Sequence, residues 1–209
     1  MRLWTIQHKK ACKSLLEKGI LVAQADDAVH DGIDDSFRRA YGWMAGKMLH
    51  LGILPLLPGT RYPVWAWYRW EGRRKRRDMR RNGYASRGTE LVQLTIEIPD
   101  HEVLLSDFDL FHYALNYWYL PFDEADDADF EKKCNEVGYC RVDLQNLGIQ
   151  TQEMLQLREL IVKSWDRILD LDREDEGRLY GGNKDKSIQA AFWQIKIDQV
   201  VEALPFIAR

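Results

Sequence analysis

The sequence predicts an α+β fold, a single domain in which a mixed or antiparallel sheet is flanked by helices. Segments that alternate apolar and polar residues, typical of strands, are interspersed with segments whose apolar residues recur every three or four positions, typical of helices. The 209 residues, 45% of them hydrophobic, can bury one sizeable core. We therefore expect one domain over residues 1–209, with room for a helical insertion at about 107–170.

The N-terminal part alternates between extended and helical patterns. The helix expected at 10–18 has apolar residues at helical spacing, and Gly19 is typical of a helix end. A longer helix is expected next, because Asp34, Asp35 and Ser36 offer an N-cap ahead of apolar residues spaced by three and four. The extended segments expected here are residues 3–7, 20–22 and 64–70.

The C-terminal part contains further elements of both kinds. Asp107 can cap a helix that runs towards Trp118, and residues 151–170 have the spacing of an amphipathic helix. Gly181 and Gly182 indicate a turn. The remaining expectations are strands at 91–98, 103–106 and 188–195, a short helix near 197–201 and an extended tail.

The most informative segment is the aromatic strand at 64–70, which leads into a basic tract at 73–81. Strand side chains alternate, so Trp65 and Trp67 are expected on one face, with Tyr68 and Trp70 on the other. Aromatic rings beside guanidinium groups, which bind oxyanions bidentately, suit a planar ligand that carries phosphates. Packed sheet core followed by a solvated hairpin fits the same residues. The tract contains Arg73, Arg74, Lys75, Arg76, Arg77, Arg80 and Arg81.

Charge is strongly segregated, although the formal net charge is only −3. Positive charge gathers at 69–81, and acidic residues gather at 123–131 and 170–176. RNA or DNA can therefore be attracted locally to the basic tract. The acidic patches suit a basic protein partner, such as an antitoxin.

Cysteine content and hydropathy limit the cellular compartments in which the protein is expected. Three cysteines do not form a paired framework, and the spacing of Cys134 and Cys140 fits no common zinc motif. No apolar run resembles a signal peptide or approaches the roughly 20 residues needed to span a bilayer. We therefore expect a cytoplasmic protein without a membrane partner or a bound metal.

Asp107, Asp109 and His112 form the one compact group of carboxylates and imidazole in the sequence. Near a helix start, Asp109 and His112 share a face, which permits a metal or an acid–base pair. Capping of the helix by Asp107 is the competing, structural interpretation. These three residues are secondary site candidates.

Four segments together resemble an uncharacterised family of bacterial proteins, filed as domain of unknown function number 3841. The resemblance covers nearly the whole chain and implies a bacterial or phage source, but no chemistry. The segments are Leu3–Gln7, Pro63–Trp67, Val103–Asp109 and Ile188–Gln194.

The order of elements also resembles ADP-ribosyltransferases of the small toxin type. The shared features are a polar first strand, the turn at Leu16–Ile20, an aromatic second strand and a polar last strand. The resemblance implies that NAD is the substrate and that Thr5 and Gln7 act from the first strand. It also implies that Trp65 or Trp67, with Tyr68 nearby, stacks on nicotinamide, and that Gln189 steadies the reacting ribose. Arg77 and Arg80 are the pyrophosphate clamp that we expect.

Two departures from that pattern limit the chemistry. Arg2 is the one candidate for the basic residue usual on the first strand, and Gln189 stands where the usual residue is glutamate. Glutamine can hydrogen-bond a ribose hydroxyl but cannot act as a carboxylate base. A self-activating target, another carboxylate or an inactive domain are the three explanations.

Three functions follow as hypotheses. The first is an ADP-ribosyltransferase-like toxin or phage-defence effector that uses NAD to modify a nucleic acid or a protein. The second is a non-catalytic module that binds single-stranded nucleic acid through the aromatic strand and the basic tract. The third is an interaction component of a toxin–antitoxin system.

Overall fold

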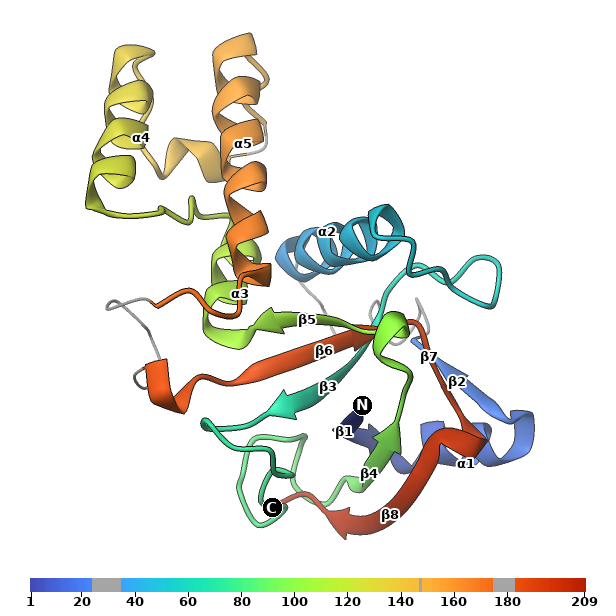
Figure 1. Ribbon diagram of the computed structural model, residues 1–209. Helices are drawn as coiled ribbons and strands as arrows, with labels where there is room; N and C mark the ends of the chain where they lie inside the picture. The colour runs from blue at the N-terminus through green and yellow to red at the C-terminus, as the bar shows by residue number, and fades with distance from the viewer. Residues whose placement is uncertain (24–34, 147, 175–182) are drawn as a thin grey trace.

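The computed structural model describes residues 1–23, 35–146, 148–174 and 183–209, and Figure 1 shows its sheet with helices packed around it. The sheet has six strands in the order β5-β6-β3-β1-β4-β8, and each neighbouring pair is antiparallel. The predicted α+β class is therefore confirmed. The strands are β1 (Arg2–His8), β3 (Val64–Arg69), β4 (Glu90–Glu97), β5 (Leu104–Asp107), β6 (Ile188–Phe192) and β8 (Val200–Ile207).

One face of the sheet packs against helix α1 (Lys9–Lys18) and a two-stranded ribbon of β2 (Ile20–Val22) and β7 (Gln194–Lys196). The helix begins after His8, whose ring accepts the backbone N–H of Lys10, and it ends at Gly19 with a φ of 74°. The predicted end of this helix is therefore confirmed. The core on this face includes Leu3, Leu15, Val64, Ala66, Leu94, Ile96 and Phe192.

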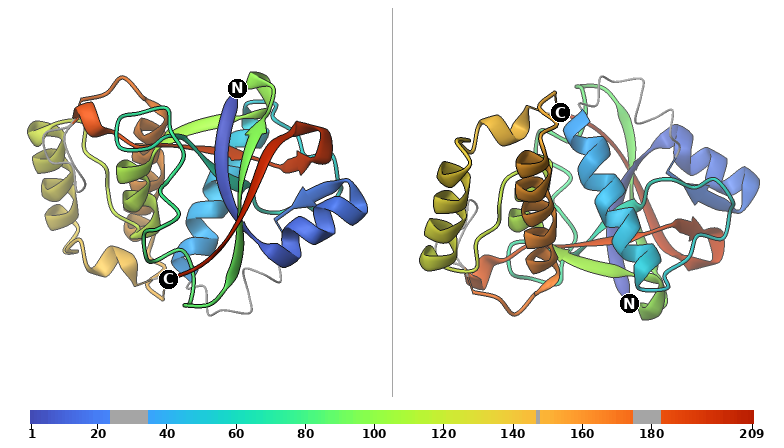
Figure 2. Two further views of the ribbon diagram at one scale, coloured as in Figure 1. Left: turned by 90° about the horizontal axis from the view of Figure 1, so that it is seen from below. Right: turned by 90° about the horizontal axis from the view of Figure 1, so that it is seen from above.

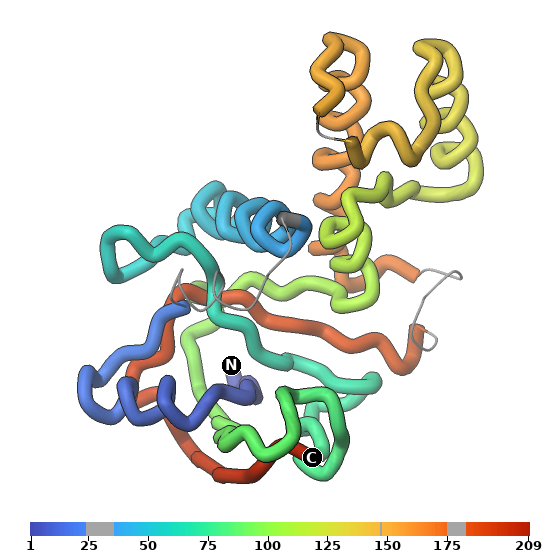
Figure 3. Tube along the Cα trace, turned by 180° about the vertical axis from the view of Figure 1, so that it is seen from behind, coloured from blue at the N-terminus to red at the C-terminus, as the bar shows by residue number. Residues whose placement is uncertain are grey.

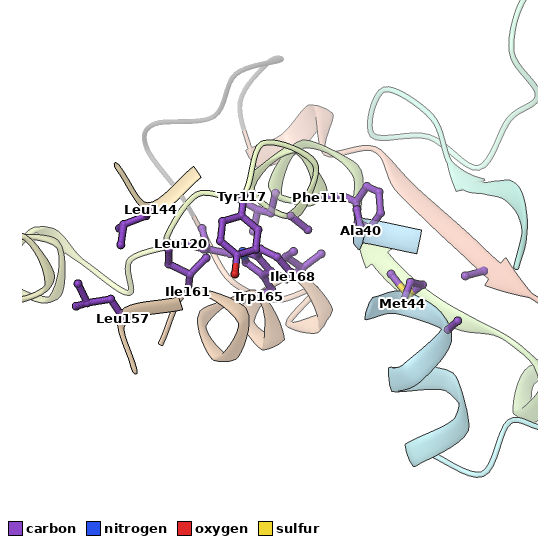
Figure 4. Packing of buried hydrophobic residues seen from close by; sticks show 14 of the residues in the cluster. Ala40, Met44, Phe111, Tyr117, Leu120, Leu144, Leu157, Ile161, Trp165 and Ile168 are labelled. Atoms are coloured by element: carbon purple, nitrogen blue, oxygen red, sulfur yellow. The ribbon is translucent and has the colours of Figure 1, made fainter. Parts of the chain in front are cut away.

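Helices cover the other face over β5 and β6. Figure 2 shows α2 lying across the sheet, and Figure 3 shows two helices that extend away from it. The close view in Figure 4 shows Met44 of α2, Phe111 of α3 and Trp165, which follows α5, within one buried apolar cluster. Ala191 of β6 belongs to the same cluster and ties it to the sheet. These helices are α2 (Asp35–His50), α3 (Phe108–Leu115), α4 (Glu124–Glu136) and α5 (Gln152–Ser164).

Several predicted boundaries differ from the structure. Helix α5 ends at Ser164 and continues as a 3-10 helix over Trp165–Leu169. The strand expected at 188–195 is interrupted at Trp193, so that β6 and β7 belong to different sheets. The expected extended tail is strand β8, which pairs with β4. The predicted cap at Asp34 and the predicted turn at 181–182 lie outside the described residues.

None of the helices in the described part of the chain has the length and apolar character needed to cross a lipid bilayer.

Candidate functional site

The aromatic strand ends in a tight hairpin that folds the basic tract back towards the sheet. Trp70 and Arg73 exchange two backbone hydrogen bonds across the two-residue turn of Glu71 and Gly72. Both turn residues have positive φ, 49° and 71°, as a type I′ turn requires. A Cβ added to Gly72 would lie 2.2 Å from the carbonyl oxygen of Lys184, so only glycine fits without a shift of the backbone.

Side chains at this junction line a groove of about 960 Å³. The hairpin and the basic tract contribute one side of it, and the start of α3 and the segment before β6 contribute the other. The backbone N–H of Glu71 donates to Ser187 Oγ at 3.0 Å, which joins the two sides. Its lining residues are Trp70, Glu71, Arg73, Lys75, Arg81, Phe108, Asp109, Asp185 and Ser187.

A smaller hollow of about 410 Å³ adjoins the groove and shares some of its lining residues with it. The hollow is lined mainly by the basic tract, including Arg76, Arg77 and Arg80. Cationic side chains therefore extend along one continuous surface from the groove into the hollow.

A row of neighbouring side chains crosses the sheet close to the groove. Ser106, Gln189, Trp67 and Trp4 stand directly opposite one another on β5, β6, β3 and β1, so they share one face. Gln189 is 7% exposed and Ser106 is fully buried. Within the described residues, Gln189 Nε2 and Ser106 Oγ have no hydrogen-bond partner, which is unusual for buried polar atoms.

The structure does not bring Thr5 and Gln7 into this row. Thr5 stands opposite Leu94, whereas its neighbour Trp4 stands opposite Thr95. Because successive strand side chains alternate, the side chains of Thr5 and Gln7 lie on the face of the sheet opposite to that of Trp4. The Thr5 hydroxyl donates to the carbonyl oxygen of Trp65 and accepts from the Gln7 amide, both at 2.8 Å. Thr5 therefore links β1 to β3, and Gln7 supports Thr5 from within the same strand. The register between the strands places both side chains on the face opposite to that of Gln189.

Arg77 covers Trp67, one of the rings predicted to stack on a ligand. The Arg77 guanidinium carbon lies 5.4, 4.1 and 4.6 Å from the ring centroids of Trp67, Trp70 and Tyr84. Burial among these rings lowers the pKa of Arg77. The ring of Phe108 packs on Trp67 as well, at 4.9 Å. Trp67 is therefore half-buried and covered by Arg77 and Phe108, whereas Trp70 and Phe108 line the groove.

The other aromatic residues of the strand also differ from the prediction. Trp70 does not lie across the sheet from Trp67, since their ring centroids are 4.5 Å apart. A register shift between Trp67 and Arg69 breaks the alternation on which that prediction relied. Trp65 is half-buried and packs against the core, with its ring 5.1 Å from the rings of both Tyr41 and Phe111. Tyr68 lies beneath the guanidinium of Arg74, at 3.7 Å.

Most cations of the basic tract have partners. Lys75 and Arg81 both bind the Glu71 carboxylate, at 3.0 and 2.6 Å, and these hydrogen bonds lower the pKa of Glu71. Arg76 pairs with Glu202. Arg74 donates to the backbone carbonyls of Tyr68 and Arg2. Arg73 forms no ion pair with any described residue.

Arg77 and Arg80 do not converge as a clamp. Arg80 binds Asp78 at 2.8 Å and holds the pKa of that carboxyl well below its usual range. Arg77 lies instead among the aromatic rings. Arg2, the remaining predicted cofactor residue, pairs with Glu97 at the surface, 2.7 Å away.

The secondary candidates separate into different roles. Asp107 accepts the backbone N–H groups of Asp109 and Leu110, which confirms the predicted cap, and its carboxylate lies 3.8 Å from the Nζ of Lys186. Asp109 is 2% exposed and lines the groove. His112 Nδ1 lies 3.0 Å from the carbonyl oxygen of Phe108. No cluster of three or more metal-ligating side chains occurs in the described ranges.

Asp185, Lys186 and Ser187 were not predicted from the sequence to belong to or support the site. Lys186 is 4% exposed and donates to the carbonyls of Leu171 and Arg173, so it holds this segment in place. A single lysine in a polar segment gives no signal of burial. The one available clue was position, because the three residues immediately precede a strand that contains Gln189.

Comparison with known proteins yields one match. The model of a family described as Domain of unknown function (DUF3841) matches residues 2–201. No match was found among curated proteins or among solved structures. The matched range contains each residue that lines the groove. The chain therefore belongs to the family described as Domain of unknown function (DUF3841).

Proposed function

We propose that this chain is an ADP-ribosyltransferase-like protein that binds NAD in the groove and modifies a nucleic acid or a protein. The observation that carries the proposal is the groove itself, which combines two aromatic rings with three cations in about 960 Å³. Its volume falls within the roughly 300–1,000 Å³ usual for ligand sites and suits a dinucleotide better than a single base.

The sheet supports the same assignment. The resemblance to ADP-ribosyltransferases implies roles for β1, β3 and β6, and these strands are neighbours in the order β6-β3-β1. Gln189 and Ser106 lie close to the groove with hydrogen-bonding capacity that no described residue uses. We assign Gln189 Nε2 to a ribose hydroxyl, because an amide can donate to it.

The ligand-binding residues change from those predicted. We assign ring stacking to Trp70 and Phe108, which line the groove, instead of Trp65 and Trp67. Arg73, Lys75 and Arg81 take the pyrophosphate, because charge-assisted hydrogen bonds to phosphate are strong and all three side chains face the groove. NAD itself supplies the reactive glycosidic bond, so the protein need only position it and stabilise charge.

Binding and turnover can be tested together. We expect NAD to bind the wild-type chain in calorimetry and to release nicotinamide when nucleic acids and cell extract are present. Arg73→Ala and Trp70→Ala should each weaken binding about tenfold or more, as expected for losing roughly 1.5–3 kcal/mol. Arg87→Ala removes an exposed arginine that lines neither space and should change nothing. Absence of both binding and release would reject the proposal.

A second candidate is a module that binds single-stranded nucleic acid. The observation that favours it is the excess of positive charge in the basic tract, where seven cations face three carboxylates, those of Glu71, Asp78 and Glu202. Short RNA or DNA should then bind with an affinity that falls as salt rises. Nucleic-acid binding that NAD does not compete for, in a chain that does not bind NAD, would favour this candidate over the enzyme.

A further inference from the structure

The basic tract covers one face of the sheet. The row that contains Gln189 and Trp67 reaches Trp4 on β1. Thr95 of β4 stands opposite Trp4, and Glu202 of β8 stands opposite Thr95, so the row crosses all six strands. Three arginines of the tract each contact a different member of this row. These contacts are Arg77 over Trp67 at 5.4 Å, Arg74 over Trp4 at 5.5 Å, and Arg76 paired with Glu202 at 3.2 Å.

The cations of the tract are divided between this row and the groove. A dinucleotide has two phosphates, which the cations at the groove can bind while the others stay at the row. Seven cations against three carboxylates exceed what one pyrophosphate can neutralise. A polymer with several phosphates therefore matches the whole tract better. The groove side has Arg73, Lys75 and Arg81, and the row side has Arg74, Arg76 and Arg77.

Side chains, rather than strand pairing, hold the tract at the row. No residue from 74 to 89 belongs to a helix or a strand. The Gln93 amide donates to the carbonyl oxygen of Arg77 at 3.0 Å. Two buried atoms at this contact, Arg77 Nε and Gln93 Oε1, have no hydrogen-bond partner among the described residues, and burial lowers the pKa of Arg77. The contact therefore leaves polar groups unsatisfied, which an anionic ligand can satisfy once the tract moves.

We infer that the basic tract is a displaceable cover, which a single-stranded nucleic acid removes from the row by binding the arginines. The inference rests on the proposed function, in which a nucleic acid is one of the two kinds of acceptor. The arginines exchange aromatic rings, carbonyl oxygens and Glu202 for phosphates, with which they form charge-assisted hydrogen bonds. Trp67 is then uncovered next to Gln189, and its ring can stack on a base or on nicotinamide. Binding of the acceptor thus opens the site, so that NAD is not consumed in its absence.

Acrylamide quenching of tryptophan emission tests the opening in the absence of NAD. The probe is inorganic polyphosphate, which carries the phosphate charge of a nucleic acid without bases that would themselves stack on tryptophan. At low salt we expect polyphosphate to increase the quenching of the wild-type chain, with a half-maximal effect at about tenfold lower phosphate concentration than pyrophosphate. Trp67→Phe should remove most of the increase. Trp118→Phe, which replaces an exposed tryptophan outside the row, is the matched control and should preserve it.

The possible failures are distinct. If polyphosphate does not increase quenching of the wild-type chain, the tract is a fixed part of the fold and the inference is overturned, whereas NAD binding is unaffected by that result. This comparison needs no variant to fold. An equal increase with poly-glutamate would also overturn the inference, because an acidic protein would then displace the tract as well as a phosphate polymer does. If polyphosphate opens the row but NAD neither binds nor releases nicotinamide, the proposed function fails instead.

Discussion

Substitution of Gly72 by alanine should destabilise the protein and separate the two sides of the groove. Gly72 has a φ of 71°, a conformation that costs a residue with a Cβ roughly 1 kcal/mol. The added Cβ would also meet the Lys184 carbonyl oxygen at 2.2 Å. Relief of that overlap requires a backbone shift, which adds about 1–3 kcal/mol. We therefore expect the free energy of unfolding, measured by urea denaturation, to fall by about 2–4 kcal/mol.

Gly83 provides a control that separates the two contributions. Its φ is 88°, and an added Cβ would meet no atom within 4 Å. Gly83→Ala should therefore lose only the conformational contribution, about 1 kcal/mol. If both variants lose the same free energy, contact between the hairpin and residue 184 does not stabilise the protein, and our account of how the groove is held together is wrong.

Three further predictions concern the basic tract and the segment before β6. Arg77→Ala should open Trp67 to solvent, so that acrylamide quenches tryptophan emission more strongly in this variant than in the Arg76→Ala control. Equal quenching in the two variants would contradict the covering of Trp67 by Arg77. Hydrogen bonds from Lys75 and Arg81 lower the pKa of Glu71 in the folded state. The ionised Glu71 carboxylate therefore contributes to stability above its ordinary pKa of 4.5, and this contribution is lost as the pH falls through the lowered folded-state pKa. Glu71→Gln should accordingly flatten the loss of stability in acid titrations followed by circular dichroism, and an unchanged acid transition would exclude Glu71 as a cause. Lys186→Met removes two hydrogen bonds and the positive charge 3.8 Å from Asp107, and should lower the free energy of unfolding by about 3–5 kcal/mol; a loss below about 1 kcal/mol would show that this buried pair is dispensable.

Patterns that repeat along the chain predicted much of the fold. Residues 91–98 alternate cleanly because one strand, β4, places successive side chains on opposite faces. Helix α4 was missed because it buries only Phe130 and Cys134, which is too few apolar residues for a helical pattern to stand out. The interruption at Trp193 has a tertiary cause, since its indole N–H donates to the carbonyl of Ile53, far away in sequence.

The site was less predictable than the fold. The aromatic residues and arginines that adjoin in sequence also adjoin at the groove, because a hairpin joins them. The covering of Trp67 by Arg77 depends on how the tract folds back, which no local pattern encodes. Likewise, Thr5 and Gln189 belong to polar strands that approach one another, but the register between strands decides which face each side chain takes.

The groove joins parts of the chain that are distant in sequence, and this affects when it can form. Glu71 and Ser187, which close the groove by a hydrogen bond, are separated by 116 positions. Strand β6 inserts between β3 and β5, so this part of the sheet is incomplete until residue 192 has left the ribosome. Until then the edge of β3 stays open beside a cluster of aromatic side chains, a surface that favours aggregation and recognition by chaperones. The groove can consequently form only after strand β6 of the nascent chain has been synthesised and has inserted beside β3.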